Sequence, residues 1–373
     1  MITYDAPSNR LWGVSDNISK LCRGLSSAFI IDVASRNSNS ASECVNIFTD
    51  IFVDQCLLIN KYRANEVYKD FELLTAWNLN LIKRIKEFYH INKTKPSIVH
   101  CHSWLVMIAS KKISSFYKVP LVYTAHFLEK QYLGLPVIPT MVDFDNIVSL
   151  ENDFFSSANA IITFGKKYKT FLVDNYRNVK SKISIIPHGV EIENNYYPKE
   201  NNILFVGRLV EEKGIYIFLE TAKKLRHLNY EFIVIGTGPL EQVLKQKYNY
   251  ENIIFKGKLN EHALNNEYYK SKIYCSTSYI ETFALTKVEA ALAKNVIITT
   301  EGPRIEEIFP KDIIFSITPG KSEELVNVLL KLARSKKLIL DRSNSTYNYA
   351  ICNYSIELLL LKTKNLYMKL LGL

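Results

Sequence analysis

The sequence lacks the marks of several protein classes. Its 373 residues include only six cysteines, with no Cys-x-x-C pair and no regular spacing, which excludes a small disulfide-stabilised scaffold. No apolar run approaches the roughly 18 to 20 residues that a membrane-spanning helix requires. The opening residues MITYDAPSNR contain neither a basic segment nor an apolar core, so no secretory signal is expected. We therefore expect a cytoplasmic protein with reduced thiols.

Low-complexity tracts and internal repeats are also missing, and the composition is that of a globular enzyme. Hydrophobic residues make up 47% and charged residues 23%, so the chain can bury a core. At roughly 150 residues per domain, the length indicates two domains. The net charge of +10 favours anionic partners, although the basic residues are spread along the chain and a solvated basic surface explains them equally well. No nucleic-acid partner is expected.

Short apolar, β-branched runs alternate with longer amphipathic segments, which indicates parallel sheets covered by helices. In the first half, strands are expected at 97–103, 120–126 and 159–165. The segment 104–118 between the first two strands has apolar residues at helical spacing and ends in lysine. In residues 28–69 the apolar residues recur at neither helical nor strand spacing, so no element is predicted there.

A second series of strands follows residues 184–202, which are rich in Pro, Gly and Asn and are interpreted as the interdomain linker. Five strands are expected after it, at 203–207, 231–236, 252–257, 272–277 and 295–300. The predicted fold class is α/β with two doubly wound domains, residues 1–187 and residues 188–349. The basic, amphipathic segment 350–373 is expected to cross back onto the first domain, with peripheral contact to a membrane as the alternative.

Glycines and charged residues gather after the second series of strands, where open α/β sheets bind their ligands. Gly207 closes a strand, and Arg208 and Lys213 stand five positions apart in the loop that follows. Two cations in one turn can hold a diphosphate, although a solvated basic loop would look the same. Gly236 and Gly238 of the GTGP turn let the backbone approach a ligand closely.

The segment YIETFALTKVEAALAKN carries two glutamates with seven residues between them. The pattern places Glu281 in a loop and Glu289 about one turn inside the following helix. The backbone N–H groups of Ala284, Leu285 and Thr286 then face outward from a helix N-terminus, where phosphate oxygens bind readily. Each carboxylate can accept hydrogen bonds from a pair of sugar hydroxyls. Two glutamates at this spacing also occur by chance in many chains.

Taken in order, IIPHGV, VGRLVEEKG, GTGP, IIFKGKL and ETFALTKVEA resemble the C-terminal domain of the retaining nucleotide-sugar glycosyltransferases of glycosyltransferase family four, over residues 183–310. Before residue 95, only LWGVSDNISKLCRGL is similar to the family's glycine-rich first loop and helix. The resemblance implies a GT-B fold, in which two Rossmann-like domains face a central cleft. It also implies hexose transfer, with retention, from a UDP-, GDP- or ADP-sugar to a glycan, lipid-linked or other hydroxyl acceptor.

The resemblance assigns a role to each matching residue. Arg208 and Lys213 would hold the donor diphosphate, and Gly13 would bring the backbone of the first domain close to it. Glu281 would contact the donor sugar, and Glu289 would bind the ribose. In this family the departing phosphate can itself take the acceptor's proton on the same face of the sugar.

The histidine of VYTAHF, His126, matches the family histidine beside the reacting hexose. The residues expected to serve catalysis are thus Glu281, Arg208, Lys213 and His126. The other residues expected at the substrate are Gly207, Gly236, Gly257, Leu259, Phe283, Ala284, Leu285 and Thr286, with Gly257 and Leu259 near the nucleobase. The family's paired glycines in the first loop appear here as Trp12 and Gly13, so that loop is expected to be shaped differently.

No Asp-x-Asp motif stands in a suitable loop, and we expect neither a cofactor nor a metal requirement. His100 and His102 with Cys101 suggest zinc, but successive residues of a strand point alternately to opposite faces and no fourth ligand is evident. Structural or acceptor-side roles are favoured for these histidines. A GT-B nucleotide-sugar epimerase and a non-catalytic nucleotide-sugar-binding protein remain alternatives to the transferase. Nucleotide sugar that is epimerised or hydrolysed without acceptor would favour the epimerase.

Overall fold

The computed structural model describes residues 1–2, 13–34, 46–48, 71–102, 104–126, 128, 130, 144–191, 197–281, 283–302, 305 and 308–373. The chain forms two compact units. The first unit comprises Met1–Phe164, Tyr168–Pro187 and Leu359–Leu373, and the second comprises Gly165–Lys167 and His188–Leu358.

Parallel strands form the sheet of the first unit. Four of them lie in the order β3-β4-β5-β6, and β1 pairs with β2. The backbone at Ile2 bridges both groups, because it pairs with Ala34 of β1 and with Cys101 of β3. The strands are β1 (Asp32–Ala34), β2 (Asn46–Phe48), β3 (Val99–Cys101), β4 (Leu121–Thr124), β5 (Ala160–Thr163) and β6 (Ile183–Ile185).

Helices connect and cover these strands, and the last helix of the chain returns to the first unit. The Tyr367 ring lies 5.8 Å from the His100 ring, and the Leu360 side chain fills the space that a Cβ on Gly24 would occupy. The C-terminal helix therefore packs on the first unit, as expected. The helices are α1 (Gly13–Leu25), α4 (Phe71–Ile91), η1 (Trp104–Val106), α5 (Met107–Tyr117), α6 (Phe144–Ser157), α7 (Lys166–Asn175), η3 (Lys180–Lys182) and α14 (Ile356–Leu371).

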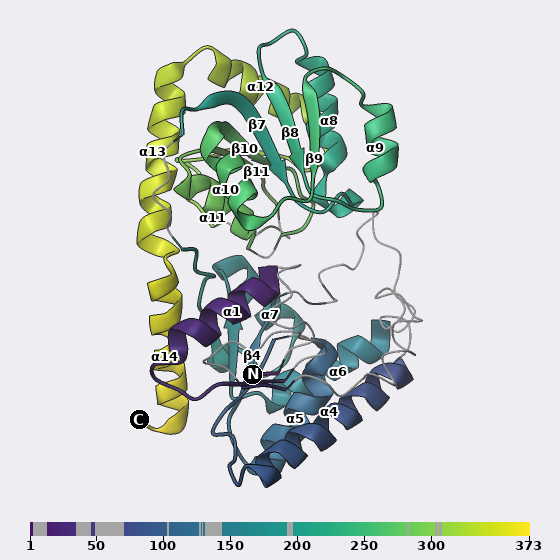
Figure 1. The fold of residues 1–373 in the computed structure, drawn as a ribbon, viewed down its shortest axis with the longest axis vertical. Coiled ribbons are helices and arrows are strands. Elements are labelled where there is room, and N and C mark those ends of the chain that lie inside the picture. Colours follow the sequence, from purple (N-terminus) through teal and green to yellow (C-terminus); the bar gives the residue numbers. More distant parts are fainter. Residues whose placement is uncertain are drawn as a thin grey trace. The chain divides into compact units, whose positions relative to one another are not determined.

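The second unit is built on a parallel sheet in the order β12-β11-β10-β7-β8-β9 (Figure 1). Numbered along the unit, this order is 6-5-4-1-2-3, the arrangement of dinucleotide-binding folds, with its switch point between β7 and β10. The strands are β7 (Glu200–Val206), β8 (Glu231–Ile235), β9 (Ile253–Gly257), β10 (Ser271–Ser276), β11 (Val296–Thr300) and β12 (Phe315–Ile317). Their side chains are largely buried in one core that includes Phe218 of the first crossover helix and Phe232.

The helices of this unit are η4 (Glu211–Lys213), α8 (Ile215–Lys224), α9 (Glu241–Lys247), α10 (Glu261–Lys270), α11 (Leu285–Leu292), α12 (Ser322–Ala333) and α13 (Lys336–Asn353). The predicted α/β class with two parallel, Rossmann-like sheets is confirmed. In the part of the chain that the structure describes, no helix has the length and apolar character needed to cross a membrane.

Two strands correct the sequence analysis. Ile183–Ile185 forms β6, although residues from 184 onward were interpreted as linker. Phe315–Ile317 forms β12, a sixth strand where five were expected. Both strands span three residues at a sheet edge, and they are only partly buried. Three residues are too few to show the alternation of apolar and polar side chains that marks a strand. The nearby Pro187 and Pro319 indicate a loop instead.

Candidate active site

The candidate site lies where the sheet order of the second unit reverses. Arg208 follows β7, and Thr277 and Ser278 follow β10, the two central strands on either side of the switch point. Open α/β sheets bind ligands at this position because the loops after the two strands diverge there. Most of the residues that the sequence predicted for the donor belong to these loops and to those of the neighbouring strands.

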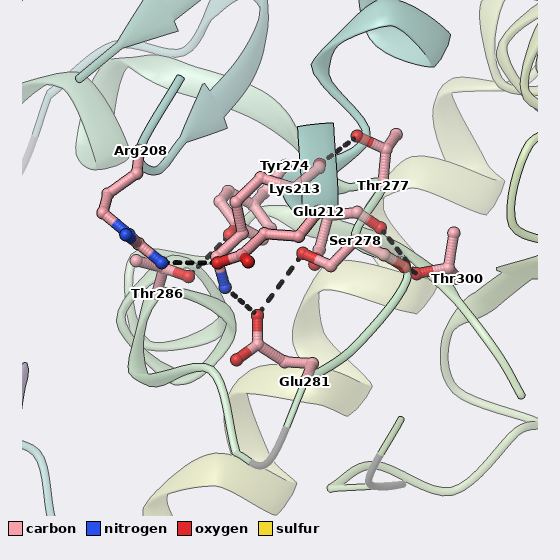
Figure 2. A network of polar contacts seen from close by, with 10 residues as sticks. Arg208, Glu212, Lys213, Tyr274, Thr277, Ser278, Glu281, Thr286 and Thr300 are labelled. Atoms are coloured by element: carbon pink, nitrogen blue, oxygen red, sulfur yellow. Dashed lines mark hydrogen bonds and ion pairs between the residues drawn. The ribbon is translucent and has the colours of Figure 1, made fainter. Parts of the chain in front are cut away.

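Hydrogen bonds fix the two central loops side by side (Figure 2). The Thr277 hydroxyl donates to the Lys213 carbonyl at 3.1 Å, and the Tyr279 N–H donates to the Glu212 carbonyl at 2.9 Å. Gly214 allows this approach, since it has a φ of +65° and a Cβ there would lie 1.9 Å from the Thr277 oxygen. The Thr300 hydroxyl, at the end of β11, donates to the Ser278 carbonyl at 2.6 Å.

Glycines join the loop after β7 to the ends of β8 and β9. Gly236 has a φ of +130°, and a Cβ on it would lie 1.9 Å from the Gly207 oxygen. The Gly207 N–H donates to the Ile235 carbonyl at 3.0 Å, and the Gly236 N–H donates to the Gly257 carbonyl at 2.8 Å. One continuous backbone surface therefore contains three of the predicted residues, Gly207, Gly236 and Gly257. The predicted residue Leu259 follows two positions after Gly257.

Both predicted cations are paired with carboxylates in this site (Figure 2). The Lys213 ammonium lies 2.9 Å from Glu281 Oε2, and the Ser278 hydroxyl donates to the same oxygen at 3.4 Å. The Arg208 guanidinium pairs with Glu212 four residues later, while 48% of its side chain remains exposed. A diphosphate bound to these cations would have to compete with two carboxylates. The sequence analysis did not recognise Glu212, because a carboxylate beside a basic motif gives no signal of its own.

The environment keeps Glu281 ionised. Burial by itself raises the pKa of this carboxyl group, but the positive charges of Lys213 and Lys287 and the hydrogen bonds from Lys213 and Ser278 outweigh it. The net result is a pKa below its ordinary value. Lys287 is almost completely buried at the start of α11, and sequence reasoning did not anticipate that it would act on Glu281.

Helix α11 begins at Leu285, directly after Ala284, which has a left-handed backbone with φ 60° and ψ 78°. The first N–H groups of the helix have no partner one turn back, so this end can face an anion. The Thr286 hydroxyl is oriented by the Tyr274 hydroxyl, which donates to it at 2.7 Å. Glu289 lies one turn into the helix, as expected, and its Oε2 accepts a hydrogen bond from Tyr268 at 2.8 Å.

Phe283 differs from the other predicted contacts, because its side chain is buried. Its ring packs edge-on against His188 at 5.1 Å and against Tyr354 at 5.4 Å. The ring therefore supports the loop before α11, and only the backbone of Phe283 is available to a ligand. A phenylalanine in this motif is compatible with either role, so the sequence pattern alone did not distinguish them.

Three histidines form a buried group in the first unit. The ring of His102 lies between those of His100 and His126, at centroid distances of 4.0 and 5.6 Å, and His102 Nδ1 lies 3.4 Å from His126 Nε2. Burial lowers the pKa of His126 to about 3, so this ring stays neutral. Both ring nitrogens of His100 are occupied, by the hydroxyls of Tyr367 at 2.5 Å and Thr124 at 2.7 Å.

His100 thus has the structural role that the sequence favoured for it. Among the residues the structure describes, no group of three or more His, Cys, Asp or Glu side chains is arranged to hold a metal ion. Gly13, the remaining predicted contact, is the first residue of α1 in the first unit. Trp12, its predicted neighbour in the first loop, lies outside the described residues.

The sequence matches the models of two glycosyltransferase families. Residues 18–194 match Glycosyltransferase Family 4, and residues 191–350 match Glycosyl transferases group 1. An uncharacterized glycosyltransferase of Methanocaldococcus jannaschii is 21% identical over 84% of this chain and 83% of its own.

Solved structures show the same fold at lower identity. Sucrose-phosphate synthase from Thermosynechococcus elongatus superposes with a TM-score of 0.80 at 15% identity, covering 100% of this chain and 98% of its own. HepE of Anabaena, solved in complex with UDP and glucose, superposes with a TM-score of 0.74 at 13% identity, covering 98% of each chain. Since the two family models together span residues 18–350, the chain belongs to the GT-B glycosyltransferases of the family-four type.

Proposed function

We propose that this glycosyltransferase takes its sugar from a nucleoside-diphosphate donor bound at the switch point of the second unit. The observation that supports this proposal is the placement of Arg208 and Lys213 on one turn, with Lys213 paired to Glu281 of the facing loop. Two cations and a helix N-terminus converge on one sheet end, which suits a leaving group with several negative charges. UDP-, GDP- and ADP-sugars are the donors considered, and the UDP complex of HepE supports the first.

Each charged residue has a role in this proposal. Arg208 and Lys213 stabilise the departing diphosphate, together with the N–H groups that begin α11. The carboxylate of Glu281, kept ionised by its neighbours, accepts hydrogen bonds from hydroxyls of the donor sugar. Glu289 does the same for the ribose. His126, which stays neutral, is suited to hydrogen bonding with the hexose rather than to charge stabilisation.

We propose that transfer retains the anomeric configuration. The bond from the sugar C1 to the phosphate oxygen breaks as the acceptor oxygen bonds to C1 on the same face. The acceptor's proton passes to the departing phosphate oxygen, so no separate base is needed. The acceptor is proposed to be a glycan or a lipid-linked saccharide.

The reaction is also proposed to proceed without a metal ion, because side-chain cations neutralise the leaving group. Initial rates measured with excess EDTA should equal those measured with added Mg²⁺, Mn²⁺ or Zn²⁺. Complete inhibition by EDTA that metal reverses would refute this part of the proposal.

The donor site is tested by replacing its cations. Arg208→Ala and Lys213→Ala should each weaken nucleoside-diphosphate binding about tenfold or more and lower turnover with it. Lys224→Ala is a matched control, because Lys224 is also ion-paired, with Glu323 at 2.5 Å, but lies at the end of α8, away from the strand ends that form the site. Binding would be followed by calorimetry, and transfer by the appearance of the donor's sugar on the acceptor.

Normal binding in both cation variants would refute the diphosphate assignment. Epimerised or hydrolysed donor that forms at the full rate without any acceptor would favour the isomerase alternative.

A further inference from the structure

A network of hydrogen bonds lies at the N-terminal end of the strands in the second unit, across the sheet from the donor site. It is centred on Lys199, which precedes β7 and belongs to the segment that the sequence analysis interpreted as linker. The Lys199 ammonium donates to the carbonyls of Tyr268, Ser271 and Ala293 at 3.3, 2.7 and 2.6 Å. An ammonium group has three N–H donors, so these hydrogen bonds use all of them.

The three carbonyls come from the ends of three elements. Tyr268 lies in the last turn of α10, Ser271 is the first residue of β10, and Ala293 directly follows α11. Carbonyls at a helix C-terminus have no partner within the helix, and the helix dipole favours a cation beside them. One side chain therefore holds the C-terminal ends of two neighbouring helices.

An ammonium in this position is costly to keep. Burial and the positive charge of Lys294 lower the pKa of Lys199 to about 7. Two of the three carbonyls, those of Tyr268 and Ser271, also accept hydrogen bonds from the buried side-chain amide of Asn295. Satisfying these two carbonyls therefore does not require a charge, and the retention of one indicates a further role for Lys199.

The two helices that Lys199 holds are also joined at Glu289. The Tyr268 hydroxyl donates to Glu289 Oε2 at 2.8 Å, and the Ala293 N–H donates to the Glu289 carbonyl at 3.0 Å. Burial and the negative charge of Glu289 raise the pKa of the Tyr268 hydroxyl, which therefore stays protonated and acts as the donor. A closed path of hydrogen bonds thus runs from Lys199 through both helices to one glutamate.

We propose that Lys199 is a positioning residue for the donor, because it fixes the ends of α10 and α11 and so keeps the Glu289 carboxylate where the ribose hydroxyls bind. A carboxylate can accept about four hydrogen bonds, so Glu289 can hold Tyr268 and the ribose together. Lys199 does not itself touch the nucleotide, since the donor site lies at the other end of the strands. The inference rests on the ribose role proposed for Glu289 and extends it to a contact at the opposite edge of the sheet.

Discrimination between nucleotides with and without ribose hydroxyls tests the proposal. The affinity for UDP, GDP or ADP, whichever binds the wild type best, is divided by the affinity for its 2′,3′-dideoxy form. Both are measured by calorimetry at about pH 6, where Lys199 is charged. The wild type should prefer the ribose form about tenfold or more, because hydrogen bonds to a carboxylate are strong.

Lys199→Ala should lower this ribose preference to about threefold or less, while the affinity for the dideoxy form stays within about twofold of the wild-type value. A merely structural role for Lys199 would weaken the binding of both nucleotides equally. n-Propylammonium has the atoms that the alanine variant lacks, so adding it should restore the preference. Tetramethylammonium carries the same charge but no N–H group and should not.

Two further variants make the test independent of a general loss of structure. Tyr268→Phe removes the hydroxyl that orients Glu289 and keeps the backbone carbonyl, so it should lower the ribose preference as Lys199→Ala does. Lys272→Ala is the matched control, because Lys272 also joins the starts of two strands, through a hydrogen bond to the Asn201 side chain at 2.5 Å, but on the exposed side. It should bind both nucleotides like the wild type.

The outcomes separate this proposal from the assignment of Glu289. If Glu289→Gln abolishes the ribose preference and Lys199→Ala keeps it, Lys199 is only structural and the proposal is overturned. If Glu289→Gln keeps the wild-type preference, the ribose is bound elsewhere, and the assignment of Glu289 fails together with the proposal. Equal rescue by the two ammonium ions would also overturn it, because hydrogen bonding would then be unimportant. The diphosphate assignment is tested separately, through Arg208 and Lys213.

Discussion

At the scale of single residues, Glu212 is the feature that most affects how a donor would bind. It pairs with Arg208, whose side chain is half exposed, and such pairs contribute at most about 1 kcal/mol. Removing the carboxylate therefore costs little, while it relieves repulsion of an incoming diphosphate. We expect Glu212→Gln to tighten nucleoside-diphosphate binding about threefold to tenfold at low salt, measured by calorimetry.

Glu211 provides the control for this change. It lies on the same turn with an exposed side chain, so Glu211→Gln alters the net charge equally without freeing Arg208. An equal gain in both variants would mean that overall charge, and not the Glu212 pair, determines affinity. Weaker binding in Glu212→Gln would mean that Glu212 holds Arg208 in its binding position.

Glu281 should separate binding from turnover. Its carboxylate is held by Lys213 and Ser278, and it is proposed to face the sugar rather than the nucleotide. Glu281→Gln keeps the size of the side chain but removes the charge. We expect turnover to fall about a hundredfold or more, with the affinity for nucleoside diphosphate changed only a few-fold. Parallel losses in kcat and in nucleotide affinity would place Glu281 at the ribose or give it a purely structural role.

At the scale of elements, the turn after β8 determines the shape of the donor site. A side chain on Gly236 would collide with the Gly207 carbonyl, so Gly236→Ala must displace the backbone that carries Arg208. We expect this variant to lose more than about 3 kcal/mol of unfolding free energy and most of its nucleotide affinity. Urea unfolding and calorimetry would measure the two effects.

Gly257 offers a control with a similar backbone but open surroundings. Its φ is +65°, and no atom lies within 4 Å of an added Cβ, so Gly257→Ala should cost only about 1 kcal/mol of backbone strain. If both variants were equally destabilised, a positive φ alone would explain the effect, and the contact with Gly207 would be unimportant.

The elements also show how far the sequence could be interpreted. The long buried strands, such as β8, and the loop after β7 were predictable because apolar runs and glycines mark them locally. The three-residue strands β6 and β12 were not predictable, because they are too short to show an alternation of apolar and polar residues. Nor was the pairing of Lys213 with Glu281, since these residues are 68 positions apart and only the sheet order brings them together.

At the scale of the whole molecule, the predicted donor contacts are unevenly divided between the two units. Arg208, Lys213, Glu281 and Glu289 all belong to the second unit, which has its own sheet and core, whereas Gly13 and His126 belong to the first. Domains with their own core can fold alone. Nucleotide binding and sugar transfer should therefore be separable.

A fragment of residues 188–358 tests this division. We expect it to fold cooperatively and to bind nucleoside diphosphate within about tenfold of the full chain, because the two cations and the start of α11 are retained. Transfer should be undetectable, since the fragment lacks His126 and the rest of the first unit. Circular dichroism would check folding, and calorimetry would measure binding. The same fragment with Arg208→Ala should bind about tenfold more weakly. A folded fragment that binds no nucleotide would show that essential donor contacts come from the first unit, which would contradict the expectation that nucleotide binding and sugar transfer are separable.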